Sequence, residues 1–201
     1  MKTKSKGFWE KLKSPSARYS VLTLLGLGFI GGIAVLSGFL GELHASAQES
    51  FCISCHEMEE NVYMEYKNTA HFSNKSGVRA TCADCHLARD LGPKLARKTV
   101  AARELFNKIK GTIDTREKFL DHRLTMATRV WKEMKANDSR ECRSCHDAQA
   151  MDYYKQSRRA RLAHIRGDNE KLTCIDCHKG IAHLLPDMTG IDPSAVIGNR
   201  P

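Results

Sequence analysis

The hydrophobic pattern of the chain begins with one long apolar run near the N-terminus. Residues 19–41 are 23 consecutive positions without a formal charge, rich in Leu, Val, Ile, Phe and Gly. Because a helix rises about 1.5 Å per residue, about 20 such residues cross the hydrocarbon layer of a bilayer. The run therefore predicts a transmembrane anchor helix over residues 19–41. Gly28 and Gly32 form a G-x-x-x-G pair that permits close helix packing, so a homodimer stays open beside a monomer.

Flanking charges predict the orientation of this anchor. Six Lys and Arg side chains precede it in residues 1–18, against one acid, Glu10. The positive-inside rule places this basic flank in the cytoplasm and the chain after Gly41 outside. Ala45-Ser46-Ala47 is similar to a signal-peptidase site, so a cleaved export signal is the alternative. The apolar run is longer than the roughly 7–15 residues of such signals, which favours an uncleaved, single-pass anchor.

Beyond the anchor, apolar positions recur with helical spacing in two stretches. Residues 94–110 predict an amphipathic helix that ends at Gly111. Its apolar side is formed by Leu95, Ala102, Leu105, Phe106 and Ile109. A second helix is predicted over about 116–136, with Thr115 as its N-cap. No segment shows sustained alternation, so strands should be nearly absent.

All eight cysteines fall into four Cys-x-x-Cys-His units, which begin at residues 52, 82, 142 and 174. This is the signature of covalent haem c attachment, in which two thiols bind the haem vinyl groups and the His binds the iron. Zinc sites and disulfide scaffolds have no need of a His after every second Cys. The pattern predicts four covalent haems, attached to Cys52 and Cys55, to Cys82 and Cys85, to Cys142 and Cys145, and to Cys174 and Cys177. The iron ligands from these motifs are His56, His86, His146 and His178.

Four haems change what the composition implies about folding. Porphyrins are large and apolar, so in residues 42–201 they must supply much of the core. The haem-free polypeptide is therefore predicted to be largely unfolded outside its membrane segment. The predicted fold class is a mainly α, loop-rich multihaem cytochrome c with one N-terminal transmembrane helix and a periplasmic four-haem domain.

The net charge of +9, from 32 Lys plus Arg and 23 Asp plus Glu, points loosely toward nucleic acid. More than half of this charge lies in residues 1–18, however. Haem propionates offset much of the remainder. No nucleic-acid partner is therefore predicted, and the lipid bilayer is the expected surface for the basic flank.

The motif separations of 30, 60 and 32 residues predict two dihaem repeats. Similar segments precede His71 and His164, and each of these histidines lies shortly before the second motif of its pair. The chain is therefore predicted to consist of six segments. These are the basic flank at 1–18, the anchor at 19–41, a first dihaem unit with its following helix at 42–110, a helical connector at 111–141, a second dihaem unit at 142–185 and an extended tail at 186–201.

Each iron needs a second axial ligand unless that position is left open. His71 and His164 are candidates because the same position recurs in both repeats, and His183 lies in a short loop after motif four. Met58 follows His56 by two residues, and a thioether ligand raises haem potential relative to bis-histidine coordination. His122 remains an alternative ligand.

These residues resemble the NapC/NirT family of membrane-anchored tetrahaem quinol dehydrogenases. The resemblance rests on residues 51–58, 76–82, 121–127 and 174–183 and covers nearly the whole chain. It implies a protein of the bacterial inner membrane that takes electrons from menaquinol or ubiquinol beside haem one, where Met58 ligates the iron. It also implies electron transfer to a periplasmic reductase. The likeness to the NapC branch implies nitrate reductase, with nitrite reductase as an alternative.

The resemblance further implies a Lys and a carboxylate at the quinol pocket, in the helix after motif two. Lys98 and Glu104 match best, and Lys94 or Asp114 could substitute. A carboxylate suits the task because quinol oxidation releases two protons. A terminal haem reductase acting on nitrite and a redox sensor are the alternative functions.

Overall fold

The computed structural model describes Trp9 and residues 18–191. The chain divides into two compact units, residues 1–46 and residues 47–201. Most of the predicted basic flank, and the tail after Ile191, lie outside the described residues.

The first unit contains helix α2, Val21–Ala45. Ser20 caps its start, where the side-chain oxygen accepts a hydrogen bond from the Thr23 amide at 3.1 Å. None of its residues is buried, and the predominantly apolar surface suits a bilayer. It is the one helix among the described residues that is long and apolar enough to cross a membrane. The predicted apolar helix is confirmed, and it continues past Gly41 because the carbonyls of Glu42 and His44 still accept helical hydrogen bonds.

The second unit is helical and rich in loops, and residues 47–191 contain no β-strand, as predicted. In chain order its elements are α3 (Glu49–Cys52), the π-helix η1 (Met58–Tyr63), α4 (Met64–Tyr66), α5 (Cys82–His86), α6 (Leu91–Ile109), α7 (Arg116–Ala136), α8 (Arg140–Arg143), the 3₁₀ turns η2 (Ala148–Ala150) and η3 (Tyr153–Lys155), α9 (Arg158–Asn169) and α10 (Cys174–Cys177).

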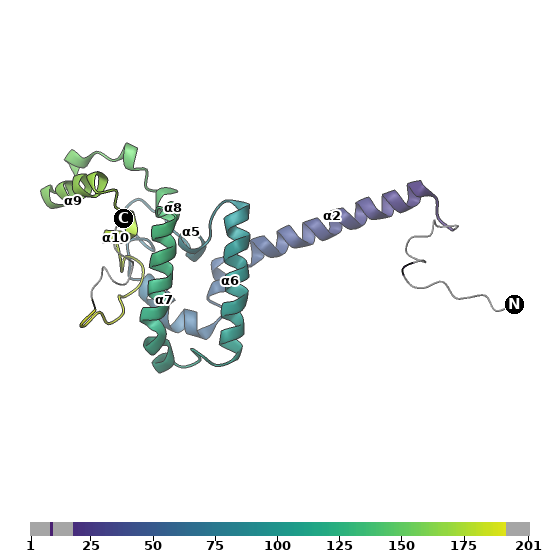
Figure 1. The fold of residues 1–201 in the computed structure, drawn as a ribbon, viewed down its shortest axis with the longest axis horizontal. Helices are drawn as coiled ribbons and strands as arrows, with labels where there is room; N and C mark the ends of the chain where they lie inside the picture. The colour runs from purple at the N-terminus through teal and green to yellow at the C-terminus, as the bar shows by residue number, and fades with distance from the viewer. Residues whose placement is uncertain (1–8, 10–17, 192–201) are drawn as a thin grey trace. The chain divides into compact units, whose positions relative to one another are not determined.

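Helices α6 and α7 form an antiparallel hairpin (Figure 1). The predicted bounds and cap of α7 are confirmed, since Thr115 Oγ1 accepts a hydrogen bond from the Lys118 amide at 3.3 Å. Helix α6 begins three residues earlier than predicted because Pro93 falls in its first turn, where no helical amide partner is lost. Gly111, with φ of +70°, stops it as expected.

A left-handed reversal after α7 brings the third and fourth haem motifs together. Ser139 has φ of +50° and is fully buried. Its hydroxyl accepts a hydrogen bond from the Ile175 amide of α10 at 3.1 Å. Ile175 in turn packs against Trp131 of α7. The start of α8 and the start of α10 are thereby fixed to the same end of α7.

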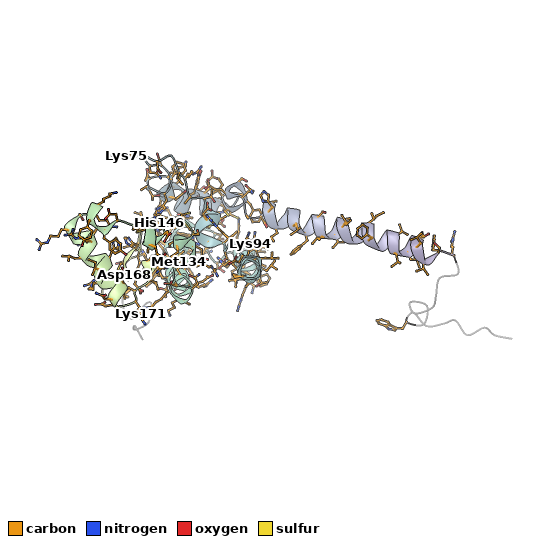
Figure 2. The ribbon with its side chains drawn as sticks, turned by 90° about the horizontal axis from the view of Figure 1, so that it is seen from above. Lys75, Lys94, Met134, His146, Asp168 and Lys171 are labelled. Carbon is orange, nitrogen blue, oxygen red and sulfur yellow. The ribbon has the colours of Figure 1, made fainter. Side chains whose placement is uncertain are left out.

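Residues 186–191 belong to the predicted tail and form neither helix nor strand. They are nevertheless attached to the unit, because Met188 and Ile191 pack against the Trp131–Ile175 cluster. Figure 2 shows Met134 and His146 toward the middle of this unit, with Lys75 and Lys171 at its edges.

Candidate functional site

Each Cys-x-x-Cys-His unit starts on a short helical turn, but only two of the units are helical at both cysteines. Helix α5 spans the whole second motif, and α10 runs from Cys174 to Cys177. Side chains three positions apart are neighbours on a helical surface. These two turns therefore present both sulfurs of a motif on one side, as attachment to one haem requires.

In motifs one and three the second cysteine lies beyond the end of the helix. Helix α3 ends at Cys52, so Cys55 falls in the bend that follows, and α8 ends at Arg143, so Cys145 falls in the next turn. The Cys145 amide still donates to the Cys142 carbonyl at 3.1 Å, which keeps this pair close together. The four units therefore do not share one helical geometry. In neither of these two motifs does a threonine stand directly before the first cysteine.

The second cysteines also differ in their surroundings. Cys145 is exposed, and its sulfur lies 3.6 Å from a terminal nitrogen of Arg89. Cys55 is half-buried, beside Lys108 of α6, whose pKa is raised by its hydrogen bonds to Cys55 and Glu57. None of the eight cysteines forms a disulfide, and their assignment to haem attachment stays a prediction.

The second motif of each predicted pair has the same cap. Thr81 with Asp84 forms a capping box at α5, and Thr173 with Asp176 forms one at α10. The amides of the two threonines donate to the aspartate carboxylates at 2.8 and 2.9 Å. The repeated Thr-Cys-x-Asp-Cys-His sequence is a signal for this cap.

Three motif histidines each face one histidine from outside the motifs. The ring centroids lie 6.1 Å apart for His71 and His146, 6.2 Å for His86 and His183, and 6.0 Å for His164 and His178. Two imidazoles on opposite sides of one metal ion, with metal–nitrogen bonds of about 2 Å, have centroids about 6 Å apart. All three pairs therefore have the spacing that suits bis-histidine ligation of one iron.

Hydrogen bonds orient two of these outer histidines. Nδ1 of His183 lies 3.2 Å from the Val62 carbonyl, which can only accept, so Nδ1 carries the proton. Nδ1 of His164 lies 2.6 Å from Oε1 of Gln156. A histidine whose Nδ1–H donates in this way keeps the Nε2 lone pair for a metal.

The protein also keeps one facing pair uncharged. Burial lowers the pKa of His86 to about 4, and burial likewise lowers the pKa of His183. Both rings are therefore neutral near pH 7. The neutral imidazole is the form that binds a metal.

The pairings do not follow the predicted repeat. His71 and His164 occupy similar positions before motifs two and four, but His71 faces His146 of motif three, whereas His164 faces His178 of motif four. His183, at the end of the second predicted dihaem unit, faces His86 in the first. Two of the three pairs therefore join the two halves of the sequence.

The alternative ligand His122 lies exposed on α7. Its Nδ1 is 2.8 Å from the carbonyl of Lys118 in its own helix. None of the ring contacts among residues 18–191 joins it to a motif histidine. The described structure thus brings His71, His164 and His183, and not His122, to the motif histidines.

Motif one has a different environment, because no ring contact among the described residues includes His56. Its Nε2 lies 3.5 Å from Oε1 of Glu57, a carboxylate only 3% exposed. The other oxygen of Glu57 is 3.2 Å from Nζ of Lys108 on α6. Met58 starts η1 directly after this pair and is 37% exposed. Motif one therefore has an acid, a cation and a thioether where the other motifs have a second imidazole.

Helix α6 brings a second cation to motif one. Nζ of Lys98 lies over the ring of Phe51 in α3, 5.9 Å from its centroid. Glu104, the predicted carboxylate partner of Lys98, instead accepts from both terminal nitrogens of Arg97 at 3.1 Å and pairs with Arg129 of α7 at 3.2 Å. The structure therefore places Lys98 at motif one and Glu104 at the contact between α6 and α7.

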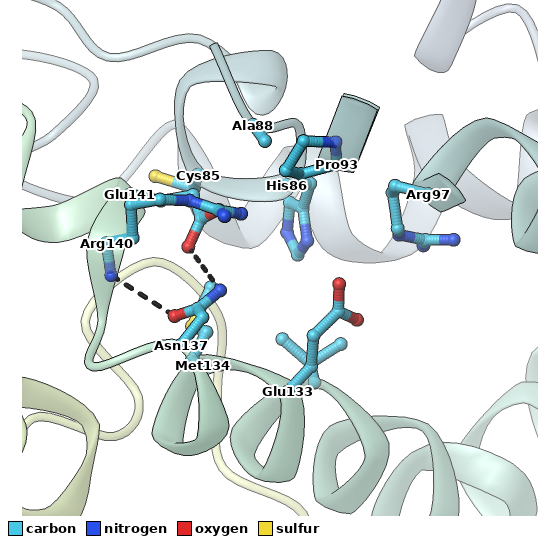
Figure 3. Close-up of a pocket in the computed structure, with 11 residues that line it drawn as sticks. Cys85, His86, Ala88, Pro93, Arg97, Glu133, Met134, Asn137, Arg140 and Glu141 are labelled. Carbon is cyan, nitrogen blue, oxygen red and sulfur yellow. Dashed lines mark hydrogen bonds and ion pairs between the residues drawn. The ribbon is translucent and has the colours of Figure 1, made fainter. Parts of the chain in front are cut away.

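A small pocket of about 20 Å³ lies beside His86 and Cys85, lined by residues of α5, α6, α7 and α8 (Figure 3). Arg97 and Arg140 line it together with Glu133 and Asn137. Both guanidinium groups already pair with carboxylates, Arg97 with Glu104 at 3.1 Å and Arg140 with Glu141 at 2.6 Å.

Comparisons with known proteins show the family of the chain. The model of the NapC/NirT cytochrome c family, N-terminal region, matches residues 14–188. The chain belongs to this family. As a member of the NapC/NirT cytochromes it is a haem c protein of electron transport. No solved structure gives a significant match to the chain.

Curated relatives of the NapC/NirT type match over most of the chain. The cytochrome c-type protein NapC of Paracoccus pantotrophus is 54% identical over 188 residues, which is 92% of this chain and 79% of that protein. The denitrification system component NirT of Stutzerimonas stutzeri is 52% identical over 181 residues, covering 90% of each chain. A protein of Allochromatium vinosum described as a tetraheme cytochrome is 49% identical over 173 residues, covering 86% of this chain and 93% of its own.

Proposed function

We propose that the chain holds four covalent haems, each on one Cys-x-x-Cys pair. The three facing histidine pairs would hold the irons of the haems at motifs two, three and four. His56 and Met58 are the ligands proposed at motif one. When bound, the haems take up and pass on electrons singly, at potentials that their axial ligands tune. The observation that supports this assignment most directly is the 6.0–6.2 Å spacing of the three pairs.

One substitution separates the proposed ligand His164 from the alternative His122. His164→Ala is expected to convert one haem in four from low-spin to high-spin, because the iron at motif four loses its second imidazole. The matched variant His122→Ala, on an exposed helix face, is expected to leave the spin states unchanged. EPR and magnetic circular dichroism of the purified holoprotein measure this. Conversion in His122→Ala and not in His164→Ala would contradict the assignment.

We further propose that the protein oxidises menaquinol or ubiquinol at motif one. One quinol yields one quinone, two electrons and two protons. An anchor helix gives the chain access to the quinol pool, and motif one has polar groups for a quinol in Lys98, Lys108 and Glu57. The carboxylate of Glu104 pairs with Arg97 and Arg129, and these ion pairs must break before it can accept a proton. The proposed quinol pocket therefore rests on Lys98.

The proposed location is the bacterial inner membrane, with the basic flank in the cytoplasm and residues after the anchor in the periplasm. The proposed electron acceptor is a periplasmic reductase. The names NapC and NirT of the relatives support nitrate reductase first and nitrite reductase second.

Quinol-dependent haem reduction tests the proposed activity. Purified full-length holoprotein in detergent is expected to show reduction of its haem absorption bands on addition of a short-chain menaquinol analogue. Addition of dithionite afterwards gives the fully reduced reference. Reduction by dithionite but not by menaquinol or ubiquinol analogues would contradict quinol oxidation and leave a carrier role. Turnover of nitrite without a partner protein would favour a terminal reductase.

A further inference from the structure

The loop that carries His183 has little structure of its own. Residues 179–187 contain no helix or strand, and their backbone makes no backbone–backbone hydrogen bond to another described residue. Gly180 turns the chain with φ of +73°, two residues after the end of motif four. The position of the His183 ring must therefore be set by contacts from other parts of the unit.

An ion pair from two distant elements holds this loop. Arg123 of α7 donates two hydrogen bonds to the carboxylate of Glu65 in α4, at 2.7 and 2.5 Å. The guanidinium also donates to the Leu184 carbonyl at 2.6 Å, and the Leu184 amide donates to Glu65 at 2.9 Å. One charged pair thus binds both the carbonyl and the amide of Leu184, the residue after His183. This pair is here called the Glu65–Arg123 clamp.

The clamp has the features of a strong contact. Its side chains are only 11% and 12% exposed, so water competes weakly for either charge. Bidentate arginine–carboxylate pairs fix orientation as well as distance, because two parallel hydrogen bonds must form together. Removing one partner from such a shielded pair leaves the other charge unbalanced.

The same segment also orients the ring itself. Val62, three residues before Glu65, supplies the carbonyl that accepts from Nδ1 of His183. The loop is therefore held at its backbone by Glu65 and at its side chain by Val62. In this position the ring stacks toward His86 with 23° between the ring planes.

We propose that Glu65 and Arg123 are positioning residues that set His183 as the second axial ligand at motif two. This inference rests on the proposed function, since it takes His86 and His183 as ligands of one iron. It adds that the ligation of this iron depends on Glu65 in α4 and Arg123 in α7, although neither helix supplies a ligand to it. If the clamp opens, the loop should release His183 while His86 and both thioether bonds remain.

The test compares EPR and magnetic circular dichroism spectra of purified full-length holoprotein variants. His183→Ala is the reference and is expected to convert one low-spin haem to high-spin. Arg123→Gln and Glu65→Gln are expected to convert the same haem with four haems still attached, and added imidazole is expected to restore the low-spin spectrum. Lys118→Gln is the matched control on α7, because its pair with Asp114 is exposed, and it is expected to keep the wild-type spectrum.

The outcomes distinguish the clamp from the ligand assignment. An unchanged spectrum in His183→Ala means that the assignment itself fails. Conversion in His183→Ala but not in the two clamp variants means that the positioning role is wrong while the assignment stands. In a variant that keeps its four haems, a conversion that imidazole does not reverse also overturns the positioning role in favour of a general structural one. Arg123→Lys keeps the charge and is expected to convert a smaller share of the same haem, which answers the question if the neutral variants do not mature.

Discussion

The haem-free chain is expected to lack a cooperative fold in residues 47–191. The described residues of this unit bury only five apolar side chains, namely Tyr66, Ala88, Phe119, Trp131 and Ile175. So small a core cannot offset the conformational entropy of ordering a loop-rich chain of this length. Covalent haems must supply the missing apolar contacts, as metals and disulfides do in small domains.

Limited proteolysis and hydrogen exchange of the full-length chain, made with and without haem c maturation, measure this effect. Proteases are expected to cut the haem-free chain throughout residues 47–191. Helix α2 in detergent is expected to stay protected in both forms, because a membrane helix satisfies its backbone hydrogen bonds internally. A cooperative thermal transition in the haem-free second unit would show that the polypeptide core suffices.

Lys98→Gln is expected to lower the rate of quinol-dependent haem reduction about tenfold, equivalent to about 1.4 kcal/mol of transition-state stabilisation. The substitution removes a cation that lies over Phe51 beside motif one and keeps a side chain of similar length. A quinol hydroxyl that loses a proton develops negative charge, which a nearby ammonium stabilises. The change should therefore appear in the maximal rate rather than in haem content.

Stopped-flow absorbance with a menaquinol analogue measures the rate, and dithionite titration checks that all haems remain reducible. Arg103→Gln is the matched control, since it removes an exposed cation from the same helix. Equal rates in Lys98→Gln, Arg103→Gln and wild type would remove Lys98 from the quinol pocket.

Much of the local structure follows from the sequence. Thr115 starts α7 because its hydroxyl can cap the helix, and Gly111 stops α6 because it adopts positive φ without strain. Helix α9 was not predicted, although Ser157 caps it by accepting from the Ala160 amide at 3.3 Å. Its apolar positions are few among many arginines, so hydrophobic periodicity gave only a weak signal.

Other contacts of the site could not be read from the sequence. Glu57 and Lys108 meet across the space between motif one and the end of α6, and Glu65 meets Arg123 across two helices. This chain has many charged residues, and no sequence pattern indicates which acid pairs with which distant base. The family resemblance indicated Lys98 and Glu104 together, while the folded helix directs them to different neighbours.

By itself, the sequence determined the chemistry that is local in the chain. Each Cys-x-x-Cys-His unit spans five consecutive residues, so its thiols and imidazole stay close whether or not the second cysteine is helical, and the apolar run dictates α2 by composition. Only the tertiary structure decided which outer histidine faces which motif. His71 with His146, and His86 with His183, come from distant segments, and long-range contacts such as Ser139 with Ile175 and Glu65 with Arg123 connect other distant segments in the same unit. Long-range pairing of this kind is set by packing, which no local pattern encodes.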